Sequence, residues 1–165
     1  MSRAFVNEDN QEEAPLIPPR APLPKGVTNY VTPAGLKALQ DEREELNGII
    51  EHLIKSEDSK EKRYKLQLEK GKLNLLEERL SSARLLQFDK EMEEVRFGAK
   101  VTVRFDNENQ TQTFQIVGVD EADVKQNKIA FTAPVAKVLN GKKTNEQAIL
   151  ELGPRKRPMT ILAIA

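Results

Sequence analysis

Two stretches of the chain repeat leucine or isoleucine at alternating steps of three and four residues. The first stretch has this stripe at Leu36, Leu39, Leu46, Ile50 and Leu53, and the second at Leu66, Leu73, Leu76, Leu80 and Ala83. Such spacing places apolar side chains on one face of a helix and is typical of a coiled-coil seam. Only the short polar segment 56–61 separates the two stripes. The pattern therefore predicts two helices that fold back on each other as an antiparallel coiled-coil hairpin.

The ends of these helices have their own signals. Thr32-Pro33 joins a capping hydroxyl to proline at the first helical position, so the first helix is expected to begin there and to run to about Lys55. Asp58 is followed three residues later by Glu61, which is the spacing of a capping box. This predicts Asp58 as the N-cap of a second helix that continues to about Leu86.

From Phe97 onward the pattern changes from helical to alternating. Strands are expected at 101–105, 114–117, 128–131, 148–152 and 159–164, and Pro134 opens a short helix that stops before Asn140-Gly141. The sequence therefore predicts an α+β protein. Residues 31–90 form the antiparallel α-helical hairpin, and residues 91–165 form an antiparallel β domain with one short helix.

Residues 1–30 have a different composition from the rest. An acidic cluster is followed by five of the nine prolines of the chain, between Pro15 and Pro24. Proline at this density favours extended polyproline II geometry and opposes helix and central strand. We expect a disordered, proline-rich extension, with a docking peptide as the alternative.

Composition excludes several classes of site. The chain has 165 residues, no cysteine, one histidine (His52) and no net charge. Disulfides, thiolate metal sites and multi-histidine metal sites are therefore ruled out. No stretch approaches 18 apolar residues and no signal peptide is recognisable, which predicts a cytoplasmic protein without a membrane partner. No phosphate-binding glycine loop, HExxH motif or nucleophile elbow is present, so we expect no enzyme in its own right.

Four runs of sequence, 30–36, 97–103, 114–123 and 133–143, resemble the Gre family of bacterial transcript-cleavage factors. The likeness is strongest in Phe114-Gln115-Ile116-Val117-Gly118-Val119-Asp120-Glu121-Ala122-Asp123. The resemblance implies an FKBP-like fold for the C-terminal domain, which would grip the rim of the secondary channel of RNA polymerase. It also implies that the coiled coil enters that channel and activates the intrinsic nuclease of the polymerase against backtracked transcripts.

The family's tip carries an acidic pair in the pattern Asp-x-Lys-Glu, which Asp58-Ser59-Lys60-Glu61 matches. The resemblance implies that Asp58 and Glu61 are catalytic residues supplied in trans, sharing a Mg²⁺ ion with the polymerase, with Glu57 in reserve. Mg²⁺ prefers carboxylate and water oxygens, so such a pair suits a loosely held ion. The protein would need no cofactor of its own beyond the Mg²⁺ of the polymerase active site. The alternative is that Asp58 and Glu61 only cap the second helix.

The resemblance also implies contacts with bacterial RNA polymerase and with the 3′ end of the nascent RNA. Asp120, Glu121, Asp123 and Pro134 are the expected docking residues, and Lys62, Arg63 and Lys65 form the expected RNA-contacting basic patch. The alternatives are a polar strand connection at 120–123 and a solvated helix face at 62–65. The protein is expected to act as a monomer.

Two departures from the family keep a second function open. Lys62-Arg63-Tyr64-Lys65 replaces an Asn-Ala-Glu-Tyr-like run, and each arm is shorter by about two turns, roughly 11 Å. A short-armed relative could occupy the channel as a competitor or modulator without inducing cleavage. Two further rivals are a prolyl isomerase or chaperone, suggested only by the FKBP-like fold, and a coiled coil that self-associates.

Overall fold

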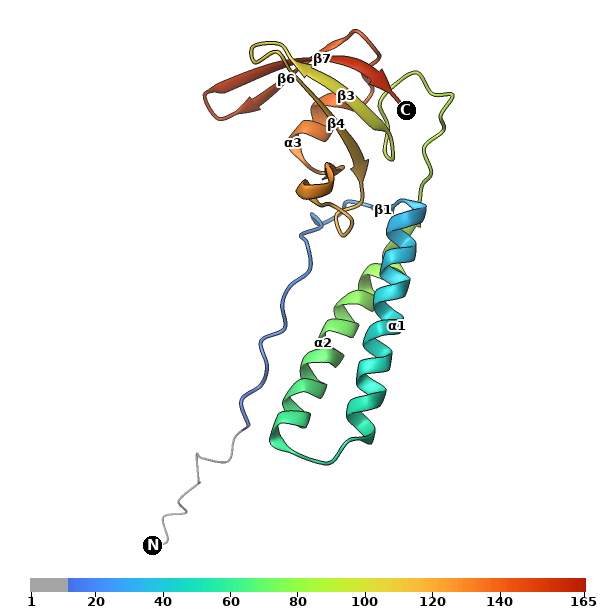
Figure 1. Cartoon of the computed structure of the whole chain (residues 1–165), viewed down its shortest axis with the longest axis vertical. Helices are drawn as coiled ribbons and strands as arrows, with labels where there is room; N and C mark the ends of the chain where they lie inside the picture. The colour runs from blue at the N-terminus through green and yellow to red at the C-terminus, as the bar shows by residue number, and fades with distance from the viewer. Residues whose placement is uncertain (1–11) are drawn as a thin grey trace, which may run out of the picture.

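The computed structural model describes residues 12–165, and Figure 1 shows a helical hairpin with a small β domain at one end. Helix α1 spans Pro33–Lys55 and helix α2 spans Lys60–Ser82. Each helix has 23 residues, which at 1.5 Å per residue gives a rod of about 34 Å. The predicted α+β class is confirmed, as is the start of α1 at Pro33 with Thr32 as its N-cap.

The predicted seam forms the core of the hairpin. Leu39, Leu46 and Ile50 of α1 and Leu76 of α2 are buried. Four further seam positions are partly buried against this core: Leu36, Leu73, Leu80 and Ala83. The seam is therefore closed within one chain. A self-associating coiled coil would need this same seam to pair between chains.

A two-stranded parallel sheet closes the base of the hairpin. Strand β1 (Asn29–Val31) pairs with β2 (Ala83–Leu85), which follows α2 directly. The amide of Asn29 also donates to the carbonyl of Arg79 over 3.0 Å. The second helix consequently ends at Ser82 rather than near Leu86 as the sequence predicted, because the chain turns into this strand.

The β domain is one five-stranded sheet in the order β5-β4-β3-β7-β6. Its elements are β3 (Lys100–Phe105), β4 (Gln110–Val117), the 3₁₀ turn η2 (Val124–Gln126), β5 (Lys128–Ala130), α3 (Pro134–Leu139), β6 (Gln147–Leu152) and β7 (Arg155–Ile164). All neighbours are antiparallel except β4 and β5, which are parallel. The expectation of a purely antiparallel sheet was thus wrong at one edge, because the connection through η2 returns the chain before β5 begins.

The core of the β domain is the inward face of this sheet with α3 packed against it. Val101, Val103, Met159 and Ile161 are fully buried, and Leu139 of α3 joins them. The alternation that predicted β3 appears directly in its burial pattern, in which every second side chain is buried.

Aromatic side chains join the β domain to the base of the hairpin. Tyr30 of β1 lies 5.8 Å from Phe97 and 5.7 Å from Phe131, centroid to centroid, and the two phenylalanines lie 5.6 Å apart. Gly118, after β4, comes so close that an added Cβ would lie 2.5 Å from the carbonyl oxygen of Tyr30. Close packing at this junction holds the sheet near the start of α1.

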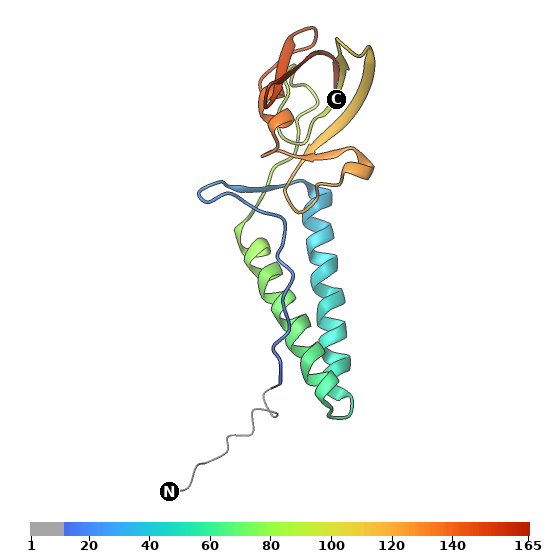
Figure 2. The ribbon, with the colours of Figure 1, turned by 90° about the vertical axis from the view of Figure 1, so that its left-hand side faces the viewer.

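Residues 12–28 contain no helix or strand, in agreement with the extended geometry that their prolines favour. Figure 2 shows this segment running alongside the hairpin toward the β domain. Contacts made by Ile17 and Arg20 hold it there. The part of the prediction that concerns residues 1–11 lies outside the described residues.

Candidate functional site

The tip of the hairpin is a tight polar connection between α1 and α2. The hydroxyl of Ser56 donates to the carbonyl of Leu53 over 2.7 Å, which closes the end of α1. The ammonium of Lys62 donates to the carbonyls of Ile54 and Ser56 over 3.1 and 2.7 Å. Lys62 therefore ties the start of α2 back to the end of α1 and fixes the shape of the tip.

The cap of α2 differs from the sequence prediction. Ser59, not Asp58, is the N-cap: its hydroxyl accepts a hydrogen bond from the backbone N–H of Lys62 over 3.0 Å. Glu61 lies in the first turn of the helix, where a negative charge complements the helix dipole. The predicted capping box was therefore wrong, and the carboxylate of Asp58 is not used to cap the helix.

Asp58 instead pairs with Arg63. One guanidinium nitrogen of Arg63 lies 2.7 Å from Asp58 Oδ2, and another lies 2.6 Å from Glu12 Oε1 of the N-terminal segment. These hydrogen bonds, first to Glu12 and then to Asp58, raise the pKa of Arg63. In turn, the pKa of Glu12 is lowered, chiefly by its hydrogen bond to Arg63. All three groups are solvent-accessible, and Asp58 is 73% exposed.

The predicted tip residues therefore fall into two groups. Asp58, Lys62 and Arg63 already bind groups of this chain, whereas Glu61 and Lys65 are exposed and have no ion-pair partner among residues 12–165. Among the described residues, no group of three or more His, Asp or Glu side chains could hold a metal ion. The ion that Asp58 and Glu61 are expected to share with the polymerase stays a prediction.

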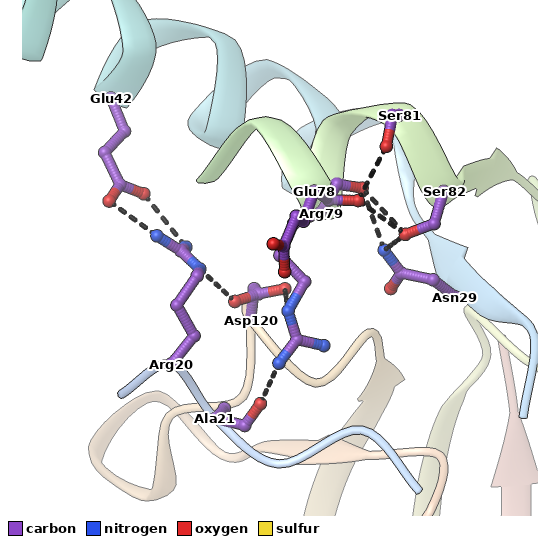
Figure 3. Close-up of polar contacts among 9 residues, drawn as sticks. All are labelled: Arg20, Ala21, Asn29, Glu42, Glu78, Arg79, Ser81, Ser82 and Asp120. Carbon is purple, nitrogen blue, oxygen red and sulfur yellow. Dashed lines mark hydrogen bonds and ion pairs between the residues drawn. The ribbon is translucent and has the colours of Figure 1, made fainter. Parts of the chain in front are cut away.

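The second predicted cluster, at 120–123, lies at the base of the hairpin, and most of it faces inward. The side chain of Asp120 is 6% exposed and pairs with two arginines: its Oδ1 lies 2.9 Å from Arg20 Nε, and its Oδ2 lies 3.7 Å from Arg79 Nε. Figure 3 shows the carboxylate of Asp120 between these two guanidinium groups, with Arg20 reaching on to Glu42 of α1.

Glu121 binds the start of α1. Its Oε2 accepts the hydroxyl hydrogen of Thr32 over 2.5 Å, while the same hydroxyl oxygen accepts the backbone N–H of Gly35. Its other oxygen lies 3.6 Å from Lys128 Nζ, and its side chain is 9% exposed. A carboxylate at a helix N-terminus is stabilised by the unpaired N–H groups there. Glu121 thus anchors the β domain to the first turn of α1.

Asp120 and Glu121 are both covered and paired within the chain, and their role in docking stays a prediction. Asp123 is partly exposed and caps η2 by accepting the N–H of Lys125 over 2.9 Å. Pro134 is exposed at the start of α3. Asp123 and Pro134 are the members of the predicted docking set that remain at the surface.

The sequence reading missed Arg20, Glu42 and Arg79, which complete the cluster around Asp120. One signal was present: Arg20 is the single charged residue among the prolines between Pro15 and Pro24. Arg79 lies off the predicted seam, so the apolar spacing did not indicate a buried role.

Comparison with known proteins decides the family. Residues 90–165 match the family model described as transcription elongation factor, GreA/GreB, C-terminal part. Over 138 residues the chain is 36% identical to transcription elongation factor GreA of Francisella philomiragia, an alignment that covers 73% of this chain and 86% of that protein. The chain belongs to the GreA/GreB family of transcription elongation factors.

Other relatives match over a shorter part of the chain. The chain is 42% identical over 79 residues to GreA of Hyphomonas neptunium, covering 47% of this chain and 50% of that protein. It thus spans about half the length of the first relatives that it matches. It is also similar to the crystal structure of GreA factor homolog 1 of Thermus thermophilus, with 25% identity, a TM-score of 0.40 and coverage of 84% and 99% of the two chains. None of the helices in residues 12–165 is apolar enough over a sufficient length to cross a membrane.

Proposed function

We propose that this protein binds bacterial RNA polymerase through its β domain and inserts its hairpin into the secondary channel. Asp58 and Glu61 then stimulate the polymerase to cleave backtracked transcripts in the cytoplasm. One observation carries the proposal: in a GreA/GreB-family chain, two carboxylates lie at the exposed far end of a rod of about 34 Å whose other end is fixed to a globular domain.

The chemistry favours carboxylates at this point. Mg²⁺ keeps several waters in octahedral geometry and is readily bound by one or two carboxylates together with phosphate oxygens. A second metal ion about 4 Å from the first stabilises both the attacking and the leaving oxygen in phosphodiester hydrolysis. Glu61 is free to contribute directly. Asp58 first has to exchange Arg63, which is feasible because the pair is exposed and such pairs are weak.

The remaining predicted residues take supporting roles. Asp123 and Pro134, which are accessible, would contact the channel rim, while Asp120 and Glu121 would hold their loop in place from behind. Lys65 would meet the phosphates of the extruded RNA 3′ end, and Arg63 would join it once Asp58 is released. The protein itself would be no enzyme but an activator of the polymerase.

A second candidate function is a channel competitor or modulator that does not induce cleavage. Two observations favour it: helices of 23 residues limit the reach of the tip, and Arg63 neutralises Asp58. A carboxylate that stops even a few ångströms short cannot bind the ion, because ligation requires about 2.1 Å.

The two candidates separate in one assay on a purified, backtracked elongation complex. Mg²⁺-dependent shortening of the transcript, lost in the double variant Asp58→Asn/Glu61→Gln, supports the cleavage factor. The matched control, Glu44→Gln/Glu45→Gln, changes the same charge on exposed residues of α1 away from the tip and should retain shortening. Binding without shortening supports the competitor. Absence of polymerase binding overturns both.

A further inference from the structure

The N-terminal segment lies in a groove on α2 that is shaped for it. Gly71 has no side chain, and a Cβ there would lie 2.3 Å from Cδ1 of Ile17. Leu75 and Arg79 follow Gly71 at steps of four residues, and with Ile17 and Pro19 they line one hollow on this face. This face is separate from the seam toward α1, so α2 packs on two sides.

The same segment reaches the β domain through Arg20. Its guanidinium donates to both carboxylate oxygens of Glu42 on α1, over 2.8 and 3.0 Å, and to Asp120 over 2.9 Å. Next to it, the carbonyl of Ala21 accepts a hydrogen bond from Arg79 of α2. Two consecutive residues therefore connect both helices and the β domain, as Figure 3 shows.

Arg20 is the main partner of a nearly buried charge. Asp120 is 6% exposed, and its Oδ2 has no hydrogen-bond partner although Arg79 lies 3.7 Å away. Only Arg20 donates a side-chain hydrogen bond to Asp120 in the described chain. A buried carboxylate needs such a partner because its loss of hydration is otherwise uncompensated.

The prolines suit this segment to a bridging role. Polyproline II geometry is extended and already restricted before the segment binds, so ordering it costs little backbone entropy. The prolines also lack N–H donors, so the segment contacts the helices and the β domain through its side chains and carbonyl groups. Ile17 on one helix and Arg20 at the domain junction are then sufficient anchors.

We propose that residues 15–24 are an intrachain strap that locks the β domain against the hairpin and thereby sets the direction in which the hairpin points. Without the strap, the aromatic cluster, the bond from Thr32 to Glu121 and the proximity of Arg79 to Asp120 still join the two parts. What is lost is the bridge from Glu42 to Asp120, which lies away from the other contacts of α1 with the β domain. The angle between hairpin and β domain then becomes variable. This inference does not depend on what the tip does.

The test measures the distance between the two parts in the full chain. Because the chain has no cysteine, spin labels can be attached at Glu57→Cys in the tip and Lys137→Cys on α3, both exposed. Pulsed electron paramagnetic resonance should give one narrow distance distribution in the otherwise unchanged protein.

Two independent variants should widen and shift that distribution. Arg20→Ala removes the bridge, and its control Lys25→Ala removes a positive charge from an exposed residue of the same segment. Gly71→Leu fills the place of Ile17, and its control Gly48→Leu adds the same side chain to α1 where a Cβ meets nothing within 4 Å. Both controls should keep the narrow distribution.

Neither variant touches the buried clusters of the hairpin or the sheet, and unchanged far-ultraviolet circular dichroism would show that the helices remain. If Arg20→Ala and Gly71→Leu both keep the distribution of their controls, the strap does not set the angle and the proposal is overturned. If Gly71→Leu alone has no effect, Ile17 does not anchor the segment to α2, and the proposed contact of the strap with the hairpin is overturned.

Discussion

Acidic residues occupy two regions of this molecule that look alike in the sequence and differ in the structure. At the tip, Asp58 is 73% exposed and its partner Arg63 is exposed as well. At the base of the hairpin, Asp120 is 6% exposed and lies between Arg20 and Arg79. The carboxylates at the base hold the β domain and the hairpin together, whereas those at the tip remain accessible to another molecule.

The difference follows from burial rather than from charge. An exposed ion pair is weakened by water and salt, so it exchanges readily for another ligand. A buried pair contributes little net stability when intact but costs several kcal/mol when one partner is removed. The same chemical group is therefore accessible at the tip of the hairpin and a structural partner at its base.

The largest effect on stability should come from Asp120→Asn. This change leaves Arg20 and Arg79 without their buried counter-charge and should lower the free energy of unfolding by about 3–5 kcal/mol. Urea denaturation followed by circular dichroism measures it. The matched variant Asp58→Asn at the tip should leave the unfolding midpoint unchanged. Equal midpoints for the two variants would abolish the contrast between the regions.

Removing the helix cap at the base of the hairpin should cost more stability than removing the cap at the tip. Thr32→Ala removes both the N-cap of α1 and the hydroxyl that binds Glu121, so it should cost about 2 kcal/mol, the upper end for caps. Ser59→Ala removes only the exposed cap of α2 and should cost about 0.5 kcal/mol. Thermal unfolding of both variants provides the comparison, and a larger loss from Ser59→Ala would contradict it.

The two helical glycines should respond differently to alanine. Gly48→Ala should stabilise the protein by about 1 kcal/mol, because alanine is the better helix former and its Cβ meets nothing. Gly71→Ala should gain less, since the new Cβ displaces Ile17. Denaturant unfolding of the pair measures the difference. An equal gain would mean that the strap contributes nothing at α2.

The smallest effect concerns pH at the tip. Because Arg63 lowers the pKa of Glu12, the contact between them should be fully present above the ordinary pKa of Glu12 and be lost as pH falls through the lowered value. Carbon-detected nuclear magnetic resonance of the Glu12 carboxyl follows this titration. Arg63→Ala should return the pKa of Glu12 toward its ordinary value. If Glu12 titrates in the same way with and without Arg63, the two side chains are not in contact and the prediction fails.

Much of the fold could be predicted because its signals are local. Proline at the first helical position located α1 and α3 correctly, and alternation located β3 and β6. Only the second half of β4 was predicted, because the strand begins at Gln110 rather than at Phe114. The three-residue strands β1 and β2 could not be found, since they show no period and pair across the whole hairpin. The parallel edge of the sheet was missed because direction depends on the connection through η2.

The candidate sites were harder to predict for a physical reason. Polarity in a sequence does not reveal burial, so Asp120 and Glu121 looked as available as Asp58. Ser59 and Asp58 are adjacent and both are good capping residues, so spacing could not choose between them. Arg20 binds partners far away in the sequence, and only the folded chain brings these together.

The central claim, that the tip carboxylates work at the metal of another molecule, can be tested by one distance. A spin label at Glu57→Cys, next to Asp58, is measured against Mn²⁺ substituted for Mg²⁺ in the active centre of a backtracked polymerase complex. The account predicts a separation short enough for Asp58 and Glu61 to bind the ion directly. A separation longer by about two helical turns, roughly 11 Å, would contradict it and leave the hairpin as an occupant of the channel only.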